Sequence, residues 1–249
     1  MVRHMELSVA SLSERPDLLD SLPFGPGWPK FIFHDPVASR LIPTVERLFS
    51  DFNLIVLDQN DVVIAGGWGV PLTWDGTIEG LPAGWDGALE RSVTDHESTS
   101  SPNALCAMAT EVVVGHQGVG LAGRVLSALR ERGEARGLTR MIAPARPTLK
   151  HRYPLIPIER YALWMRDDGA PFDPWLRTHW RSGGRVLAPE DEAMVIEGSV
   201  SDWEEWTGMA FPESGQYVVP AALAPIDVDR ERDMARYVEP AVWMLHEAP

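Results

Sequence analysis

The sequence predicts a mixed α/β (α+β) fold in which helices flank a central sheet. The first observation is a hairpin pattern, in which two short runs of β-forming residues, 53–57 and 62–67, are joined by four polar turn residues. The second is the succession of an apolar run, a glycine-rich loop, an amphipathic helix and another apolar run in the middle of the chain. This succession is typical of a βαβ unit.

The N-terminal part of the chain is expected to contain one helix between long loops. Residues 21–36 are rich in Pro and Gly and predict an ordered loop. A helix is expected from about Pro36, because apolar residues recur there at spacings of three and four. The Gly- and Trp-rich residues 68–87 predict a second long loop, and residues 93–103 are expected to form a polar surface connection.

The middle of the chain carries the clearest elements. Residues 104–114 are apolar except for Thr110 and Glu111, which predicts a central strand covered on both faces. Residues 119–136 place their apolar side chains on one face and predict a helix. The next strand is expected over 138–143.

The C-terminal part is expected to be irregular beyond Arg146 and then to alternate between short elements. These are a helix at about 173–182, strands near 185–187 and 193–200, a helix starting at Ser201 or Asp202, and strand and turn material over 215–230.

Composition narrows the class of protein. The chain has 249 residues, 45% hydrophobic content and a formal net charge of −14. A core of good size is expected from this content. The negative balance argues against nucleic-acid binding, which needs clustered Lys and Arg. Basic residues gather only over 124–152, where a small anionic ligand could bind.

Other features exclude further classes. The lone Cys106 excludes an intramolecular disulfide and a cysteine-rich metal site, and the spacing of histidines and carboxylates predicts no metal site. No apolar run reaches the roughly 18 residues of a membrane span, and no signal peptide opens the chain. We therefore expect a cytoplasmic protein without membrane contact. The oligomeric state stays open, with a homodimer as one option.

The glycine-rich loop Gly115–Gly120 predicts a phosphate site. Glycines let backbone amides approach a ligand closely, and the N-terminus of the following helix attracts negative charge. Gly118, Gly120 and Gly123 also match the G-x-G-x-x-G pattern of dinucleotide-binding folds. Against that alternative, the loop follows a hairpin in mid-chain, and the position about 20 residues later, near Arg140, is not acidic. A purely structural glycine turn is the other alternative.

Residues Ala107–Ala122 resemble the signature of the GNAT N-acetyltransferase superfamily. In that family a central strand splays from its neighbour, and a Q/R-x-x-G-x-G/A loop cradles the pyrophosphate of CoA. Gly115 departs from the pattern because it stands where Gln or Arg is usual, and Gln117 two positions later can compensate. The resemblance implies a GNAT fold with a mixed, mostly antiparallel central sheet that is splayed at the acyl-CoA site.

The resemblance also implies one GNAT-like domain over residues 6–249. This domain carries an N-terminal extension (6–35), an insertion (146–172) and a C-terminal elaboration (201–249). The elaboration is expected to form a lid, a dimer contact or the far edge of the sheet.

The cosubstrate implied by the resemblance is acetyl-CoA or another acyl-CoA. Backbone amides from Gln117 to Ala122 would hold its phosphates, Val112 and Val114 would pair with the pantetheine arm, and Arg124 would reach a phosphate or remain a solvated helix residue. The full set implied to contact it is Val112, Val113, Val114, Gln117, Gly118, Val119, Gly120, Leu121, Ala122, Gly123 and Arg124.

Four residues are candidates for the chemistry. Glu111 lies near the end of the splayed strand, where it is either a general base or part of a structural ion pair. His151 can shuttle protons near neutral pH, or it is held structurally by a loop carbonyl. Thr148 and Tyr153 are weaker candidates. The tyrosine that the family often uses to protonate the thiolate has no counterpart here, since the corresponding helix carries His179 and Trp180 instead.

Three functions fit this resemblance. The first is direct acyl transfer from acyl-CoA to a small amine or a carrier-protein thiol. The second resembles the GNAT-like domains of polyketide loading modules, which decarboxylate malonyl-CoA and pass acetyl to a carrier-protein thiol. His151 and Thr148 or Thr110 would protonate the enolate or bind the carboxylate, with Arg146 or Arg166 as the partner of that carboxylate. The third is a non-catalytic acyl-CoA-binding protein. The aromatic loops would roof the pocket through Trp28, Trp68, Trp74 and Trp85.

Overall fold

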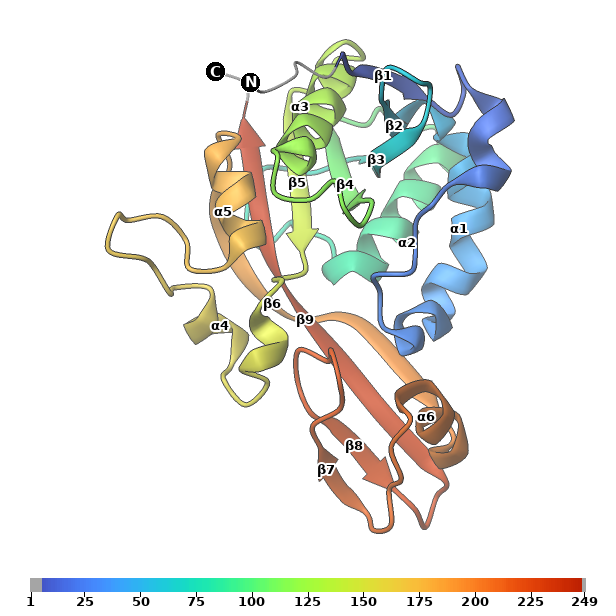
Figure 1. The fold of residues 1–249 in the computed structure, drawn as a ribbon, viewed down its shortest axis with the longest axis vertical. Coiled ribbons are helices and arrows are strands. Elements are labelled where there is room, and N and C mark those ends of the chain that lie inside the picture. The colour runs from blue at the N-terminus through green and yellow to red at the C-terminus, as the bar shows by residue number, and fades with distance from the viewer. Residues whose placement is uncertain (1–5, 248–249) are drawn as a thin grey trace.

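A sheet of nine strands runs through the whole molecule in the structure, a computed structural model that describes residues 6–247 (Figure 1). Residues 1–5 and 248–249 lie outside this description. The strand order is β1-β2-β3-β4-β5-β9-β8-β7, and β6 pairs with the other edge of β9. The strands are β1 Ser8–Ser11, β2 Asn53–Leu57, β3 Val63–Leu72, β4 Ala104–Val112, β5 Arg140–Ala145, β6 Arg185–Gly198, β7 Gly215–Tyr217, β8 Ile226–Asp229 and β9 Met234–Glu247.

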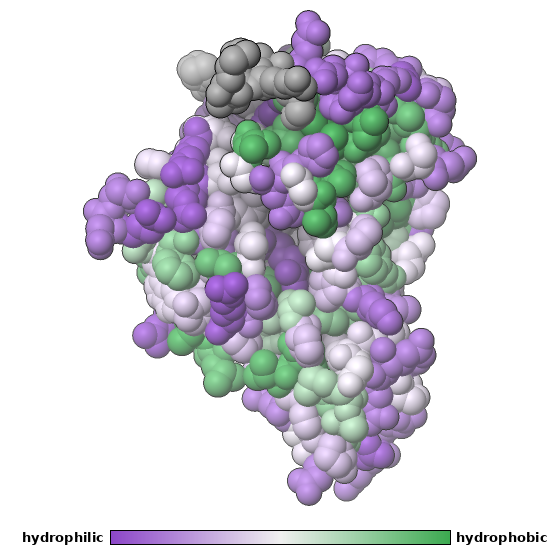
Figure 2. Space-filling view, viewed as in Figure 1, coloured by the Kyte–Doolittle hydropathy of each residue, from purple (hydrophilic) through white to green (hydrophobic). Residues whose placement is uncertain are grey.

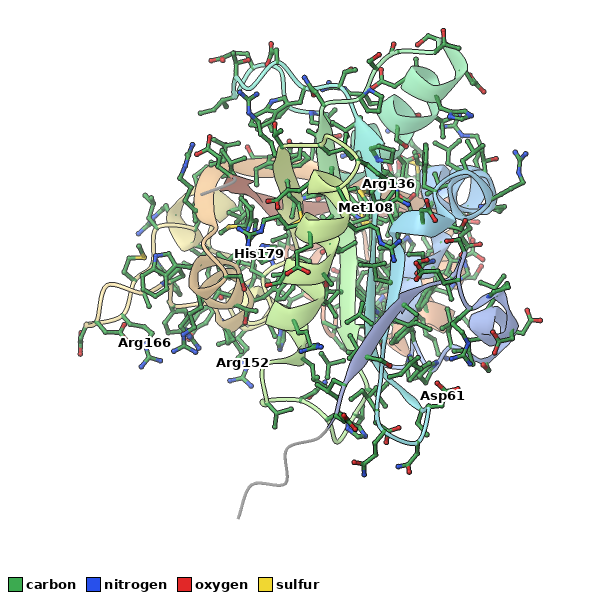
Figure 3. The ribbon with its side chains drawn as sticks, turned by 90° about the horizontal axis from the view of Figure 1, so that it is seen from above. Asp61, Met108, Arg136, Arg152, Arg166 and His179 are labelled. Atoms are coloured by element: carbon green, nitrogen blue, oxygen red, sulfur yellow. The ribbon has the colours of Figure 1, made fainter. Side chains whose placement is uncertain are left out.

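Helices cover both faces of this sheet. Helices α3 and α5 lie on one face, and α1 and α2 lie on the other (Figures 1 and 3). The α-helices are α1 Pro36–Leu48, α2 Gly84–Glu97, α3 Leu121–Glu134, α4 Ile158–Tyr161, α5 Pro174–Arg181 and α6 Val200–Thr207. Short 3-10 helices are η1 Pro16–Ser21, η2 Lys30–His34, η3 Ser50–Phe52 and η4 Lys150–Arg152. Within residues 6–247, no helix is long and apolar enough to cross a membrane.

The pairing confirms the mixed, mostly antiparallel sheet. Strands β2 and β3 form the expected hairpin, and β4, α3 and β5 form the expected βαβ unit, since β4 and β5 run parallel. The other strand pairs are antiparallel. The helix expected from Pro36 is also confirmed. Asp35 caps it, because the Asp35 Oδ1 accepts a hydrogen bond from the Ala38 amide at 2.6 Å.

The prediction of loops over 68–87 and 93–103 is wrong in part. Strand β3 continues to Leu72, and helix α2 occupies Gly84–Glu97. Three of the buried residues of α2 are small, namely Gly84, Ala88 and Ser92, and only Leu89 and Val93 are larger apolar residues. Its pattern therefore offers few of the large apolar residues by which a helix is recognised in a sequence.

The C-terminal prediction needs a larger correction. The two strands expected at 185–187 and 193–200 are one strand, β6, which is interrupted between Glu190 and Met194 in its pairing with β9. Strand β9 was not expected, yet it pairs with β5 along 140–145 and so belongs to the centre of the sheet. Pro240 obscures β9 in the sequence. It lies at the interruption, where its missing N–H costs no ladder bond.

Two large apolar cores and one small cluster, formed by Leu12, Ile55, Leu57 and Val63, stabilise the described part of the chain. The larger core lies around β2–β5 and the helices beside them, and the second lies in the lower lobe formed by β7, β8, α6 and the adjoining halves of β6 and β9 (Figure 1). In the second core, the Phe31 ring stacks on Trp203 with centroids 5.4 Å apart, and it meets Tyr237 edge-on at 5.2 Å. The N-terminal segment is therefore anchored in the lower lobe.

Gly67 on β3 provides a test of the packing between the sheet and α3. A Cβ atom at Gly67 would lie 2.6 Å from Cγ1 of Val125 and 2.7 Å from the Ala109 carbonyl oxygen. We expect Gly67→Ala to destabilise the protein by about 1–3 kcal/mol and to lower Tm by roughly 2–10 °C in thermal unfolding. Gly133→Ala is the matched control, because its Cβ would make an ordinary 3.4 Å contact with Leu105. Equal Tm values for Gly67→Ala and wild type would contradict this packing.

Candidate active site

A gap between β4 and β5 is the central feature of the site. The two strands pair only between 104–106 and 140–142, after which β5 stays with β9 and β4 stays with β3. Residues 107–112 of β4 therefore have a free edge toward β5. Free N–H and C=O groups on a strand edge can pair with an extended ligand that carries amide groups.

A bulge in β4 marks the point where this free edge begins. Trp68 is paired with Ala109 and Gly69 with Ala107, so Met108 is an extra residue on β4. The Met108 carbonyl accepts a hydrogen bond from the indole Nε1 of Trp85 at 2.9 Å. Figure 3 shows Met108 in the sheet behind α3.

The glycine loop continues from the end of β4. Gly115, Gly118 and Gly120 have φ values of +93°, +80° and +88°, and a Cβ atom at any of them would meet nothing within 4 Å. Helix α3 then begins without a side-chain cap, so the amides of its first turn remain available. Loop and helix together form an open cradle whose N–H groups suit an anion.

The residues expected to contact CoA are arranged around this cradle. Val112 ends β4, and the Val113 amide donates to the Ile64 carbonyl oxygen. Val114 and Val119 are 78% and 69% exposed, which leaves two apolar side chains uncovered beside the loop. The others are Gln117, Gly118 and Gly120 in the loop, and Leu121, Ala122, Gly123 and Arg124 in the first turn of α3.

Two of these side chains already have partners. The Gln117 Nε2 lies 3.4 Å from the Val112 carbonyl oxygen, and the exposed Arg124 guanidinium donates to the Leu7 carbonyl at 3.2 Å. Leu121 points into the core. Backbone amides are therefore the main groups that the loop offers to a ligand.

Glu111 holds the N-terminal loop in place. Its carboxylate accepts hydrogen bonds from the Gly25 amide at 3.0 and 3.1 Å and from the Trp28 indole Nε1 at 2.8 Å. Gly25 and Trp28 belong to the segment that runs down to the lower lobe. Glu111 therefore anchors that segment beneath the end of β4 through neutral donors, without the ion pair considered from the sequence.

A second polar network joins this segment to the lower lobe. The Arg146 guanidinium lies over the Trp28 ring, 6.0 Å from its centroid, and its Nε donates to Glu239 at 2.7 Å. Glu239 is only 3% exposed and also accepts a hydrogen bond from the Tyr237 hydroxyl at 2.8 Å. Burial raises the pKa of Tyr237 well above its ordinary value, so this hydroxyl stays protonated. Arg146 is thus already paired with an internal carboxylate.

Asp35 and Asp86 form a third polar feature that the sequence did not reveal. Burial, together with the charge of Asp35, raises the pKa of Asp86 to about 8, and burial also raises the pKa of Asp35. From the sequence, Asp35 can be recognised only as a helix cap before Pro36, and Asp86 lies in a segment that was expected to form a loop. Their proximity depends on the packing of α1 against α2.

The insertion carries His151, Thr148 and Tyr153. The His151 Nδ1 lies 2.9 Å from the Thr148 carbonyl oxygen, and the Thr148 amide donates to Asp173 at 3.1 Å. Tyr153 packs against an aromatic group formed by Tyr161, Trp164 and Phe172. This segment is held to the first turn of α5, because Asp173 also accepts a hydrogen bond from the Tyr161 hydroxyl at 2.9 Å.

Helix α5 turns His179 toward the sheet. The His179 Nδ1 lies 2.9 Å from Nε2 of His246 on β9, and burial lowers the pKa of His179 well below its ordinary value. Figure 3 shows His179 beside α3, whereas Arg152 and Arg166 project outward on the α5 side. His179 is therefore a neutral residue of the interior and has no exposed surface to present to a thiolate.

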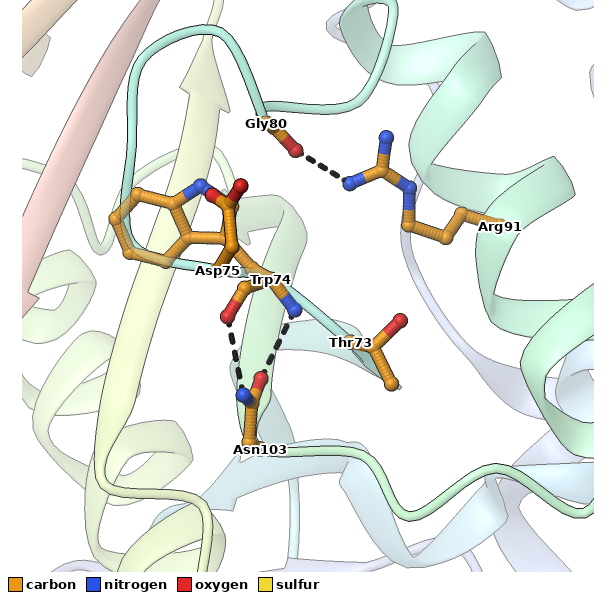
Figure 4. A pocket seen from close by; sticks show the side chains of 6 residues that line it. All are labelled: Thr73, Trp74, Asp75, Gly80, Arg91 and Asn103. Carbon is orange, nitrogen blue, oxygen red and sulfur yellow. Dashed lines mark hydrogen bonds between the residues drawn. The ribbon is translucent and has the colours of Figure 1, made fainter.

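The four tryptophans expected to roof the pocket do not lie together. Trp85 and Trp68 meet edge-on with centroids 5.9 Å apart beside the bulge, and Trp28 lies beneath Glu111. Trp74 lies at the opposite end of β4, where its backbone is bonded to Asn103 beside a hollow of about 390 Å³ (Figure 4). That hollow is separated from the glycine loop by the length of β4, so Trp74 belongs to neither the loop nor the gap.

This chain is similar to known proteins in sequence and in fold. No protein-family model matches the sequence. A curated relative, arginine N-acetyltransferase avaD of Aspergillus versicolor, is 30% identical over 275 aligned positions, which cover 96% of this chain and 93% of the relative. Among solved structures, the loading GNATL domain of CurA from Lyngbya majuscula superposes with a TM-score of 0.53 and 13% identity over 98% of each chain. This structural likeness concerns the fold alone.

The carboxyl pair predicts how stability depends on pH. Asp86 is faced by Asp35 from the cap of α1, by Glu90 from α2 and by the Val195 amide from β6. Between the ordinary pKa of 3.8 and about 8, the folded protein keeps a proton on Asp86 that the unfolded chain has lost. The free energy of unfolding should therefore fall as pH rises through this window.

Asp86→Asn removes this titration. Urea unfolding at several values from roughly pH 5 to roughly pH 9 should show a flatter decline for Asp86→Asn than for wild type. Glu97→Gln, which removes the same charge from an exposed position of α2, should keep the wild-type slope. Parallel profiles for wild type and Asp86→Asn would show that Asp86 is not protonated in the folded protein.

Proposed function

Since this chain belongs to the GNAT N-acetyltransferase superfamily and is an acyl-CoA-dependent acyltransferase, we propose that it transfers an acetyl group from acetyl-CoA to an amine of a small, positively charged acceptor related to arginine. The observation that carries the proposal is the relatedness to an arginine N-acetyltransferase along almost the whole chain. Two regions beside β4 support it independently. The glycine cradle at the end of β4 suits an anion, and the region around Glu111 and Trp28 contains carboxylates.

On the CoA side, the support comes from the free backbone groups. The cradle of Gly115, Gly118 and Gly120 and the uncapped start of α3 would bind the pyrophosphate. The free edge of residues 107–112 would pair with the amides of the pantetheine arm, which would bring the thioester to the gap between β4 and β5. Arg124 would add a cation at the rim of the cradle.

On the acceptor side, the support comes from charge. The Trp28 indole donates to Glu111, and Arg146, which lies over the Trp28 ring, is bonded to a second carboxylate, Glu239. A site with this balance would favour a cationic acceptor over an anionic one. It also fits a chain whose formal net charge is −14.

The proposed chemistry is direct transfer. The acceptor nitrogen attacks the thioester carbonyl carbon, the carbon–sulfur bond breaks, the nitrogen loses a proton, and the CoA thiolate takes up a proton. His151 is the proposed proton acceptor. A hydrogen bond from Nδ1–H to the Thr148 carbonyl would leave the lone pair of Nε2 unprotonated and available.

Decarboxylation of malonyl-CoA receives less support from the same residues. Arg146 is paired with Glu239 and bonded to the Ala221 carbonyl, and Arg166 is exposed and lies 3.5 Å from Asp168. Neither guanidinium is left free beside the gap for a malonyl carboxylate. We therefore propose amine acetylation as the reaction.

The proposed function predicts turnover of arginine. Purified protein with acetyl-CoA should release CoA in the presence of L-arginine, and mass spectrometry should detect acetylarginine. Neutral amines of similar size should react at least about tenfold more slowly, because they lack the charge that the site would recognise. Carbon dioxide release from malonyl-CoA without an acceptor, together with no acetylation of any amine, would contradict the proposal.

His151→Ala should reduce kcat by about 10²- to 10⁴-fold, the contribution expected of a positioned acid or base. The KM for acetyl-CoA should change little, because the proposed CoA contacts come from β4 and α3. His96→Ala, at the exposed end of α2, is the matched control and should leave both constants unchanged. An unchanged kcat for His151→Ala would exclude His151 as the proton acceptor.

A further inference from the structure

Residues 24–28 of the N-terminal segment form a strap that crosses the sheet near the end of β4. Its Phe24 ring packs on Gly66 of β3, where a Cβ atom would lie only 2.5 Å from Cζ of Phe24. Gly66 is paired with Glu111 of β4, and the Trp28 indole Nε1 donates to the Glu111 Oε2 at 2.8 Å. The strap therefore passes from β3 over β4 at one level of the sheet.

Trp28 continues this crossing from β4 to the end of β5. The paired stretches 104–106 and 140–142 differ in register by 36 residues (140 − 104), which places Arg146 opposite Thr110 when the register is extended along both strands. The Arg146 guanidinium lies over the Trp28 ring, 6.0 Å from its centroid. Trp28 therefore contacts both sides of the gap between β4 and β5 at nearly the same level.

The strap lies on the face of the sheet away from α3. Adjacent residues of a strand point to opposite faces, and a Cβ atom at Gly67 would meet Val125 of α3, whereas one at Gly66 would meet the strap. Helix α3 closes its own face with the buried side chains of Leu121 and Val125. A group that leaves the gap sideways therefore has to leave it toward the strap.

This geometry defines where the acyl group of a bound acyl-CoA would lie. The gap is closed where 104–106 and 140–142 pair, and it is open toward the glycine loop. A pantetheine arm on the free edge would thus bring its thioester near the bulge at Met108, whose carbonyl is bonded to the Trp85 indole. The acyl group would lie between Trp85 and Trp28, which are both half-buried. Figure 2 shows the surface hollowed below α3, where β4 and β5 end in Figure 1.

We propose that Trp28 limits the length of the acyl group, so that the site accepts acetyl and excludes butyryl and longer chains; this inference rests on the placement of CoA in the proposed function. The Trp28 ring is held from both strands, by Glu111 at its nitrogen and by Arg146 over its face. Arg146 is itself fixed by the buried Glu239 at 2.7 Å. The ring cannot turn aside for a longer chain without losing these contacts, and overlap with a fixed side chain is costly.

The experiment compares acetyl-CoA with butyryl-CoA as donors to L-arginine. Wild type should favour acetyl-CoA in kcat/KM by at least about 100-fold, because the added carbons would overlap the ring. Trp28→Ala should lower this ratio at least about tenfold, chiefly through a faster reaction with butyryl-CoA. Trp28→Phe keeps most of the ring and loses only the N–H group, so its ratio should stay close to that of wild type. Trp180→Ala, at an exposed position of α5, is the matched control and should behave as wild type.

Binding in the absence of an acceptor gives a second readout. In calorimetric titrations, wild type should bind butyryl-CoA at least about tenfold more weakly than acetyl-CoA, and Trp28→Ala should bind the two with similar affinity. Free CoA should bind equally to both proteins, because the glycine cradle does not include the strap. Circular dichroism shows whether each variant is folded, and Trp28→Leu takes the place of Trp28→Ala if the latter is not.

The outcomes separate this inference from the proposed function. The inference is wrong if wild type uses or binds butyryl-CoA as well as acetyl-CoA, or if the folded Trp28→Ala protein keeps the wild-type ratio. It is also wrong if Trp28→Phe relaxes the ratio as far as Trp28→Ala does, because the hydrogen bond and not the ring would then set the preference. If wild type acetylates no cationic amine, the proposed function is wrong, and the titrations without acceptor still decide the inference.

Discussion

The early parting of β5 from β4 is the constraint on which the rest of the site depends. After three paired residues on each strand, β5 follows β9 and leaves the edge of residues 107–112 without a partner. Unpaired backbone groups are costly unless water or a ligand satisfies them. The edge is open because β4 stays with β3 and β5 stays with β9 beyond residues 106 and 142, so the two strands diverge.

The proposed acceptor side is formed by segments that are far apart in the sequence. Trp28 reaches it from the N-terminal segment, Arg146 from the end of β5, and Glu239 from β9. Phe31 fixes the same N-terminal segment against Trp203 in the lower lobe. Residues 6–35 and the C-terminal strand would therefore form walls of the proposed acceptor site, which explains why neither was recognisable in the sequence alone.

Local patterns in the sequence were sufficient to predict the glycine loop and α3 but insufficient to predict the residues of the proposed acceptor side. The glycine loop and the amphipathic face of α3 lie within one short stretch, so spacing alone predicts them. Helix α2 was not predicted because Gly84, Ala88 and Ser92 provide little hydrophobic periodicity. Strand β9 was not predicted because Pro240 interrupts its apolar run. The proximity of Asp35 and Asp86 could not be predicted from the sequence, because it depends on the packing of α1 on α2.

The two faces of β4 resolve an apparent conflict between the charge of the chain and its cosubstrate. A chain with a net charge of −14 should repel CoA phosphates, yet the cradle offers amides of Gly118, Gly120 and Leu121 and no carboxylate side chain of its own. Glu111 is turned to the other face, toward Gly25 and Trp28. Because electrostatic interactions weaken over about 10 Å in salt, the local amides rather than the total charge decide what binds in the cradle. Under the proposed function, the carboxylates would then act on the acceptor without excluding CoA from the cradle.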